Sequence, residues 1–183
     1  MSRPISGLKL RQVADLTYQM VLSANIIKPP VDIDLIARRC GVTIEKTDLG
    51  EDVTGVLVSH GETGIIAYNP NQGEQRRRFT IAHELGHFVL HRNDGADTVF
   101  VDKDFIVKYR SNKLYSDLEL KQEQEANAFA ASLLMPKEFI LEEITSPRLK
   151  AFSESDVINE LANLFNVSIP AMTFRLTNLN LIY

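Results

Sequence analysis

The spacing of apolar positions along the chain changes from helical to alternating and then back to helical. Helical spacing predicts a first helix over residues 8–25, which ends at the prolines of segment 28–30. A short second helix follows, with Asp32 or Asp34 as its N-terminal cap and Gly41 as its stop. The amino-terminal part of the chain is therefore expected to be helical.

Three segments rich in β-branched residues come next: VTIEKTDL, TGVLVSHG and TGIIAYNP. Residues 61–64, Gly-Glu-Thr-Gly, link the second and third segments as a hairpin would. Together the segments predict a small antiparallel sheet of about three strands. The edge of TGIIAYNP could bind an extended peptide as an added strand, although an ordinary core strand has the same pattern.

Helical spacing returns in the second half of the chain, where it predicts four helices: about 71–91, 117–134, 155–165 and 169–178. A polar, irregular stretch separates the first two of them and covers roughly residues 93–114. Ser155 and Ser168 are candidate caps of the last two helices. The order of elements predicts an α+β fold, in which the sheet packs on a pair of helices and further helices lie at both ends of the chain.

Composition excludes several classes of partner. The chain has 183 residues, 44% of them hydrophobic and 24% charged, as in a globular protein with one sizeable core. A formal net charge of -4 gives no general attraction to nucleic acid or to anionic membranes. The first residues lack the apolar region of a signal peptide, and Cys40 is the only cysteine, so no internal disulfide can form. We expect a cytoplasmic protein.

Three of the four histidines lie in FTIAHELGHFVLH, residues 79–91. His83 and His87 are one helical turn apart, so both imidazoles can bind one metal ion, and their spacing suits zinc. Glu84 is rotated by about 100° from His83, which directs its carboxylate to a water molecule beside the ion, where it can act as a general base. Gly86, inside the helix, suggests that another backbone passes close by, and we expect a strand bordering the cleft.

A third ligand is required. A metzincin would have histidine at position 93, where this chain has Asn93, and we expect His60 in the hairpin to be solvated. His91 suits a role as an outer donor, or is only a polar residue at the helix end. The helical face that contains Glu123 also carries small residues and Asn127, whereas Glu125 points about 160° away, towards solvent.

Glu123 is therefore the expected third ligand, and Asn127 can hydrogen-bond a ligating histidine and fix its tautomer. The alanines of this helix would allow it to approach the histidine helix closely. The donor that steadies the oxyanion stays open among Tyr68, His91 and Tyr115.

RRRFTIAHELGHFVLH followed by EQEANAFAASLLMP resembles the ImmA/IrrE family of zinc metallopeptidases, and PVDIDLIARRCGVTI is similar to the amino-terminal region of that family. The resemblance covers roughly residues 25–140. It implies one zinc ion per chain, bound by His83, His87 and Glu123, with Glu84 as the general base. Three parts are expected: an N-terminal helical segment (1–30), a zinc metallopeptidase domain (31–140) and a C-terminal helical appendage (141–183) packed on the same core.

The resemblance implies an endopeptidase that cleaves a helix-turn-helix repressor in stress responses or mobile elements. The alternative is a binding module without proteolysis that retains the zinc site and sequesters its partner, for instance as a toxin–antitoxin component. Helices 155–165 and 169–178 have helix-turn-helix spacing, but residues 151–183 contain one arginine and three acidic residues. A surface of this charge is poor for phosphates, so we expect packing or partner docking and no direct nucleic-acid binding. The oligomeric state and the activating signal stay open.

Overall fold

The computed structural model describes residues 7–92, 98–103 and 116–182. In chain order its elements are α1 (Gly7–Ser23), α2 (Ile33–Arg39), β1 (Val42–Lys46), β2 (Val53–His60), β3 (Thr63–Tyr68), α3 (Glu74–His91), β4 (Thr98–Lys103), α5 (Asp117–Leu134), α6 (Lys137–Ile144), a 3-10 helix (Pro147–Leu149), α7 (Glu154–Phe165) and α8 (Ile169–Asn178). The predicted α+β class is confirmed. None of the described helices is long and apolar enough to cross a membrane.

The sheet differs from the prediction in two respects. Its described strands number four, in the order β1-β3-β2-β4, because residues 98–103 of the stretch predicted to be irregular form β4. It is mixed, since β2 runs antiparallel to β3 and β4, whereas β1 runs parallel to β3. The connection after β1 passes β3 and enters β2, so the two strands that are nearest along the chain are not neighbours in the sheet. TGIIAYNP is paired on both sides and is a core strand, without the free edge that strand addition requires.

Helix α3 lies against one face of the sheet. Leu57 of β2 and Ile66 of β3 are partners in the antiparallel register, and both are completely buried on that face. Glycines let the helix approach: a Cβ at Gly64 would come within 3.0 Å of the Phe88 ring, and one at Gly55 within 2.5 Å of Thr80 Cγ2. The sheet therefore holds the middle of α3 at close range.

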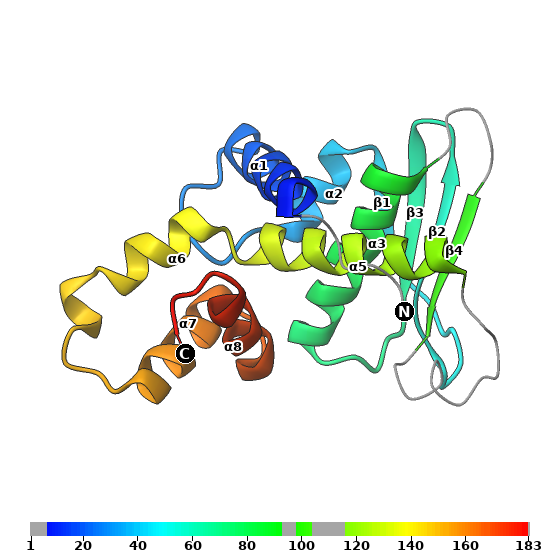
Figure 1. Ribbon diagram of the computed structural model, residues 1–183. Helices are drawn as coiled ribbons and strands as arrows, with labels where there is room; N and C mark the ends of the chain where they lie inside the picture. The colour runs from blue at the N-terminus through cyan, green and yellow to red at the C-terminus, as the bar shows by residue number, and fades with distance from the viewer. Residues whose placement is uncertain (1–6, 93–97, 104–115, 183) are drawn as a thin grey trace.

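Helix α5 crosses the other side of α3, and α1 packs on α5 (Figure 1). Figure 1 shows the sheet at one end of this helical layer and α7 and α8 at the other. Phe165, Met172 and Leu176 of the C-terminal helices belong to the same buried apolar cluster as Leu133 of α5. The C-terminal helices thus share the core of the remaining elements, while the domain boundaries at 30 and 140 stay predictions.

Side-chain caps mark where several helices begin. Asp32, and not Asp34, caps α2 by accepting from the backbone of residue 35. Ser153 caps α7, so the expectation for Ser155 is wrong by two residues, while Ser168 caps α8 as expected. In each case the side-chain oxygen satisfies a backbone N–H of the first turn, which has no partner within the helix.

Candidate metal centre

Two histidines and a carboxylate converge where α3 crosses α5. The Nε2 atoms of His83 and His87 are 3.2 Å apart, and both side chains are almost completely buried. Glu123 of α5 places Oε1 3.2 Å from Nε2 of His87 and Oε2 3.8 Å from Nε2 of His83. One donor atom from each of the three residues lies within 4.8 Å of the others. The structure thus brings together the three residues that the sequence suggested as ligands.

The close approach of α3 and α5 depends on small residues at their crossing. A Cβ at Gly86 would lie 3.1 Å from Cα and 3.2 Å from O of Ala126, and 3.2 Å from Cβ of Phe129. The backbone expected beside Gly86 is therefore that of helix α5, and the prediction of a strand at this place is wrong. The small side chain of Ala126 on α5 allows the two helices to lie this close together, and Glu123 can therefore reach the histidines of α3.

Hydrogen bonds to the second ring nitrogens indicate the tautomers. Asn127 Oδ1 lies 3.1 Å from Nδ1 of His83 and accepts its proton, which leaves Nε2 with a free lone pair. Nδ1 of His87 lies 3.2 Å from Nδ1 of His91, whose Nε2 lies 3.0 Å from Oε2 of Glu125. Burial lowers the pKa of His91, although the hydrogen bond to Glu125 acts to raise it.

The prediction that Glu125 faces solvent is wrong. Its side chain is 3% exposed and forms an ion pair with Lys9 of α1 at 2.6 Å, besides its contact with His91. Burial acts to raise the pKa of Glu125, but the hydrogen bonds from Lys9 and His91 outweigh it and lower the pKa below its ordinary value. Helix α1 covers the face of α5 that the helical wheel assigned to water.

The three residues fit a metal ion of zinc type. Two imidazole nitrogens at about 2.0–2.1 Å from one ion in tetrahedral geometry are about 3.3 Å apart, close to the 3.2 Å found between His83 and His87. When Nδ1 of His83 donates to Asn127 and Nδ1 of His87 donates to His91, both Nε2 lone pairs point into the same space, where a cation offsets their repulsion. Two nitrogens and one carboxylate oxygen are also a donor set that zinc accepts, with a fourth position left for water or substrate.

Glu84 is completely buried between α3 and the sheet. A Cβ at Gly55 of β2 would lie 3.1 Å from Oε1 of Glu84, so the strand leaves just enough room for this carboxylate. The absence of a side chain at Gly55 is what permits a strand to pass directly over Glu84. No feature of the sequence alone identified Gly55 as part of this site.

Phe100 of β4 is a second residue that sequence reasoning missed. Its ring stacks on His87, with the ring centroids 4.7 Å apart and the planes inclined by 22°. Tyr68 ends β3, and its ring lies under the guanidinium of Arg77, 5.0 Å from the ring centroid. Tyr115 lies outside the described residues, so a role for either tyrosine in stabilising the oxyanion stays a prediction. The β-branched and aromatic residues of TVFV were the signal that could have revealed β4 and with it Phe100.

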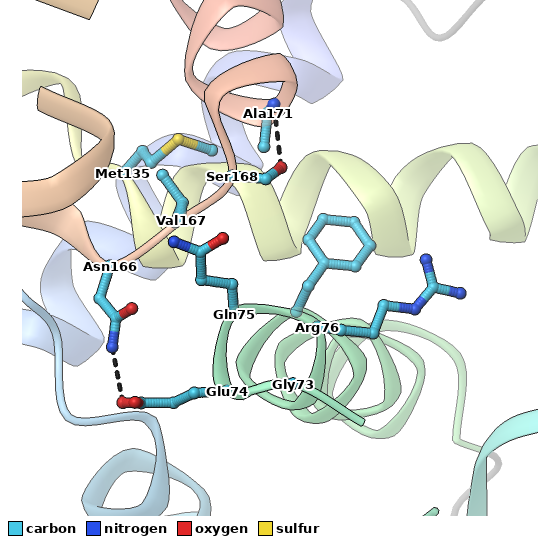
Figure 2. A pocket seen from close by; sticks show the side chains of 10 residues that line it. Gly73, Glu74, Gln75, Arg76, Met135, Asn166, Val167, Ser168 and Ala171 are labelled. Atoms are coloured by element: carbon cyan, nitrogen blue, oxygen red, sulfur yellow. Dashed lines mark hydrogen bonds between the residues drawn. The ribbon is translucent and has the colours of Figure 1, made fainter. Parts of the chain in front are cut away.

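A pocket of about 650 Å³ lies at the amino-terminal end of α3 (Figure 2). Its lining joins α3 to the end of α5 and to the α7–α8 turn, with Phe79 and Met135 among the apolar residues and Gln75 and Arg76 among the polar ones. The ring of Phe79 stacks on His83 at 6.3 Å between centroids. The pocket is therefore one helical turn away from a candidate ligand.

Comparisons with known proteins give three findings. The family model described as the IrrE N-terminal-like domain, a peptidase family, matches residues 37–177. Metallopeptidase ImmA from Bacillus subtilis (strain 168) is 28% identical over 138 residues, which are 75% of this chain and 70% of that protein. A solved structure of a Mycobacterium tuberculosis transcriptional regulator is similar in fold, with a TM-score of 0.60 and 20% identity. That match covers 91% of this chain but only 46% of the regulator, so this chain spans less than half its length.

Proposed function

Because the chain belongs to the ImmA/IrrE family of metallopeptidases, we propose that it is a zinc-dependent endopeptidase and that its substrate is a helix-turn-helix repressor. The observation that carries the proposal is the meeting of His83, His87 and Glu123, whose donor atoms lie within 4.8 Å of one another, next to the buried Glu84. A metallopeptidase needs three protein ligands and a base beside an open position, and these four residues suit the ligand and base roles.

The residues of the chain divide the chemical work. A zinc ion held by these residues would act as a Lewis acid on the peptide carbonyl. It would also lower the pKa of its bound water to about 7. Glu84 accepts the proton of the attacking water and passes it to the leaving amine. Asn127 and His91 hold the two histidines in the tautomer in which Nε2 carries the lone pair. The strand at Gly55 encloses the carboxylate of Glu84. Its electrostatic interactions are therefore stronger, because bulk water screens them less.

Two features suit a peptide substrate. β4 is paired with β2 on one side and is the outermost described strand beside His87, so an extended peptide can add to its other edge. The pocket at Phe79 lies one helical turn from His83 and has room for substrate side chains. We propose that the peptide crosses α3 between these two places, with its scissile bond at the histidines.

The choice of a repressor is supported by the family resemblance, which associates such peptidases with helix-turn-helix regulators. The structural neighbour is itself a transcriptional regulator, which agrees with a regulatory setting but concerns that protein alone. A repressor acts on DNA in the cytoplasm, which is a reducing compartment. The chain has a single cysteine and so forms no internal disulfide, which suits that compartment. We therefore propose a cytoplasmic protease without nucleic-acid contacts of its own.

The test is to incubate the zinc-loaded protein with the repressor encoded beside its gene and to follow cleavage by mass spectrometry. The wild type should release two fragments, and Glu84→Gln, which keeps the three ligands, should bind zinc but release none. If both proteins relieve repression and neither yields a fragment, the protease proposal fails and sequestration of the repressor replaces it.

A further inference from the structure

A line of polar side chains leads from α1 through α5 to the candidate ligand His87. Lys9 Nζ lies 2.6 Å from Oε1 of Glu125, and Oε2 of the same carboxylate lies 3.0 Å from Nε2 of His91. Nδ1 of His91 then lies 3.2 Å from Nδ1 of His87. The side chains of Glu125, His91 and His87 are each 3–5% exposed, so water does not compete for these contacts.

The direction of each hydrogen bond follows from the carboxylate at the start. An ionised carboxylate can only accept, so Nε2 of His91 carries the proton that it donates to Glu125. A His91 ring with this one proton presents Nδ1 as an acceptor, to which Nδ1 of His87 donates. Nε2 of His87 is left without a proton, and this is the atom that faces His83 and Glu123.

We propose that Glu125, anchored by Lys9, is a positioning residue that fixes His91 and through it keeps the Nε2 lone pair of His87 available to the metal ion. This rests on the proposed metal site and deepens it, since it makes helix α1 a part of the support of that site. Glu125 itself touches neither substrate nor metal.

Burying the carboxylate of Glu125 costs free energy unless its oxygens have partners. A carboxylate with 3% exposure needs partners for its charge. Simple attachment of α1 to α5 would explain the contact with Lys9. It does not explain why the second oxygen is directed at His91, which in turn faces His87. The two explanations differ in what they predict for metal affinity.

Glu125→Gln separates them, because an amide presents one acceptor and one donor where the carboxylate presents two acceptors. The amide oxygen faces Lys9, whose ammonium can only donate, so the NH₂ group is directed at His91. His91 then has to accept at Nε2 and donate at Nδ1, and the proton of His87 moves to Nε2. The lone pair needed for the metal ion is lost in that arrangement.

The experiment measures zinc affinity by competition with a chromophoric chelator, together with the unfolding temperature of each zinc-free protein. Glu125→Gln should weaken zinc binding by roughly 10- to 100-fold, the range typical of a group that orients a ligand, and Glu123→Ala should weaken it further. Asp34→Asn is the matched control, because it breaks another partly buried ion pair of α3, with Arg77, away from the histidines. Its zinc affinity should stay within about twofold of the wild type.

Two further readouts exclude a merely structural effect. His91→Gln keeps one acceptor and one donor and should retain most of the affinity, whereas His91→Phe should not. Nitrogen NMR of the zinc-free wild type should show His91 protonated at Nε2, and Glu125→Gln should shift that proton towards Nδ1. Unchanged zinc affinity in Glu125→Gln, or a loss no larger than that of Asp34→Asn, overturns the proposal and leaves the proposed protease intact. A wild type that binds no zinc overturns both.

Discussion

Replacement of Gly86 by alanine tests whether the contact of α3 with α5 builds the metal centre. The added Cβ would lie 3.1 Å from Cα of Ala126 and 3.2 Å from Cβ of Phe129, against an optimum of about 3.5–4.0 Å between carbon atoms. The first of these atoms belongs to the α5 backbone and the second is fixed to it, so neither can turn aside. The whole of α5 has to move by a few tenths of an ångström.

Two opposing effects determine how much Gly86→Ala changes the free energy of unfolding. Alanine is favoured over glycine inside a helix by about 1 kcal/mol, whereas an extra methyl group in a well-packed contact costs about 1–3 kcal/mol. The zinc-free variant should therefore be less stable than the wild type by about 0–2 kcal/mol. Zinc binding requires Glu123 to return towards His83 and His87, so the same overlap opposes binding. A cost of about 1–3 kcal/mol corresponds to a roughly 5- to 150-fold weaker affinity.

The assay is urea unfolding of the zinc-free protein, followed by zinc titration against a chelator. Gly73→Ala, at the N-cap of the same helix, is the control, because nothing lies within 4 Å of the Cβ it adds, and its zinc affinity should match the wild type. A Gly86→Ala protein that is more stable than the wild type and binds zinc equally well would refute the argument, because the helices would then not depend on this contact.

Three other changes have distinct expected results. Phe100→Ala removes the ring stacked on His87, and the loss of about 0.5–1.5 kcal/mol should appear as a fewfold weaker zinc affinity in the same titration; unchanged affinity would remove Phe100 from the site. Arg78→Met removes the hydrogen bond from Nε to the carbonyl of Asn166, so urea unfolding should show a loss of about 1–3 kcal/mol with zinc binding intact; equal stability would show that this buried guanidinium does not hold the α7–α8 turn. Removal of zinc by a chelator should stop repressor cleavage and lower the unfolding temperature, since a ligand at 100 times its Kd stabilises by about 2.7 kcal/mol; continued cleavage would exclude metal catalysis.

Features that depend only on helical geometry could be predicted from the sequence. The spacing of apolar residues gave α5 with the bounds that the structure has, because a capping serine precedes it and a proline follows it. The same geometry placed His83 over His87 and Glu123 on a face with small residues, and the structure brings these three side chains together.

Features that depend on distant segments could not be predicted in this way. Glu125 was assigned to solvent because a helical wheel does not show which neighbouring element covers each face, and its partner Lys9 is far away in the sequence. Strand β4 is a short apolar run between polar residues, and such a run has too few positions to establish a period. The parallel pairing of β1 with β3 depends on the path of a connection, about which side-chain alternation carries no information.

A crystal structure of the zinc-loaded protein, with anomalous scattering measured at the zinc edge, can show whether α3 and α5 together hold one metal ion. We expect a single peak per chain, at about 2.0–2.2 Å from Nε2 of His83, Nε2 of His87 and a carboxylate oxygen of Glu123. A peak bound instead by Glu125 and His91, or no peak in a protein saturated with zinc, would contradict it.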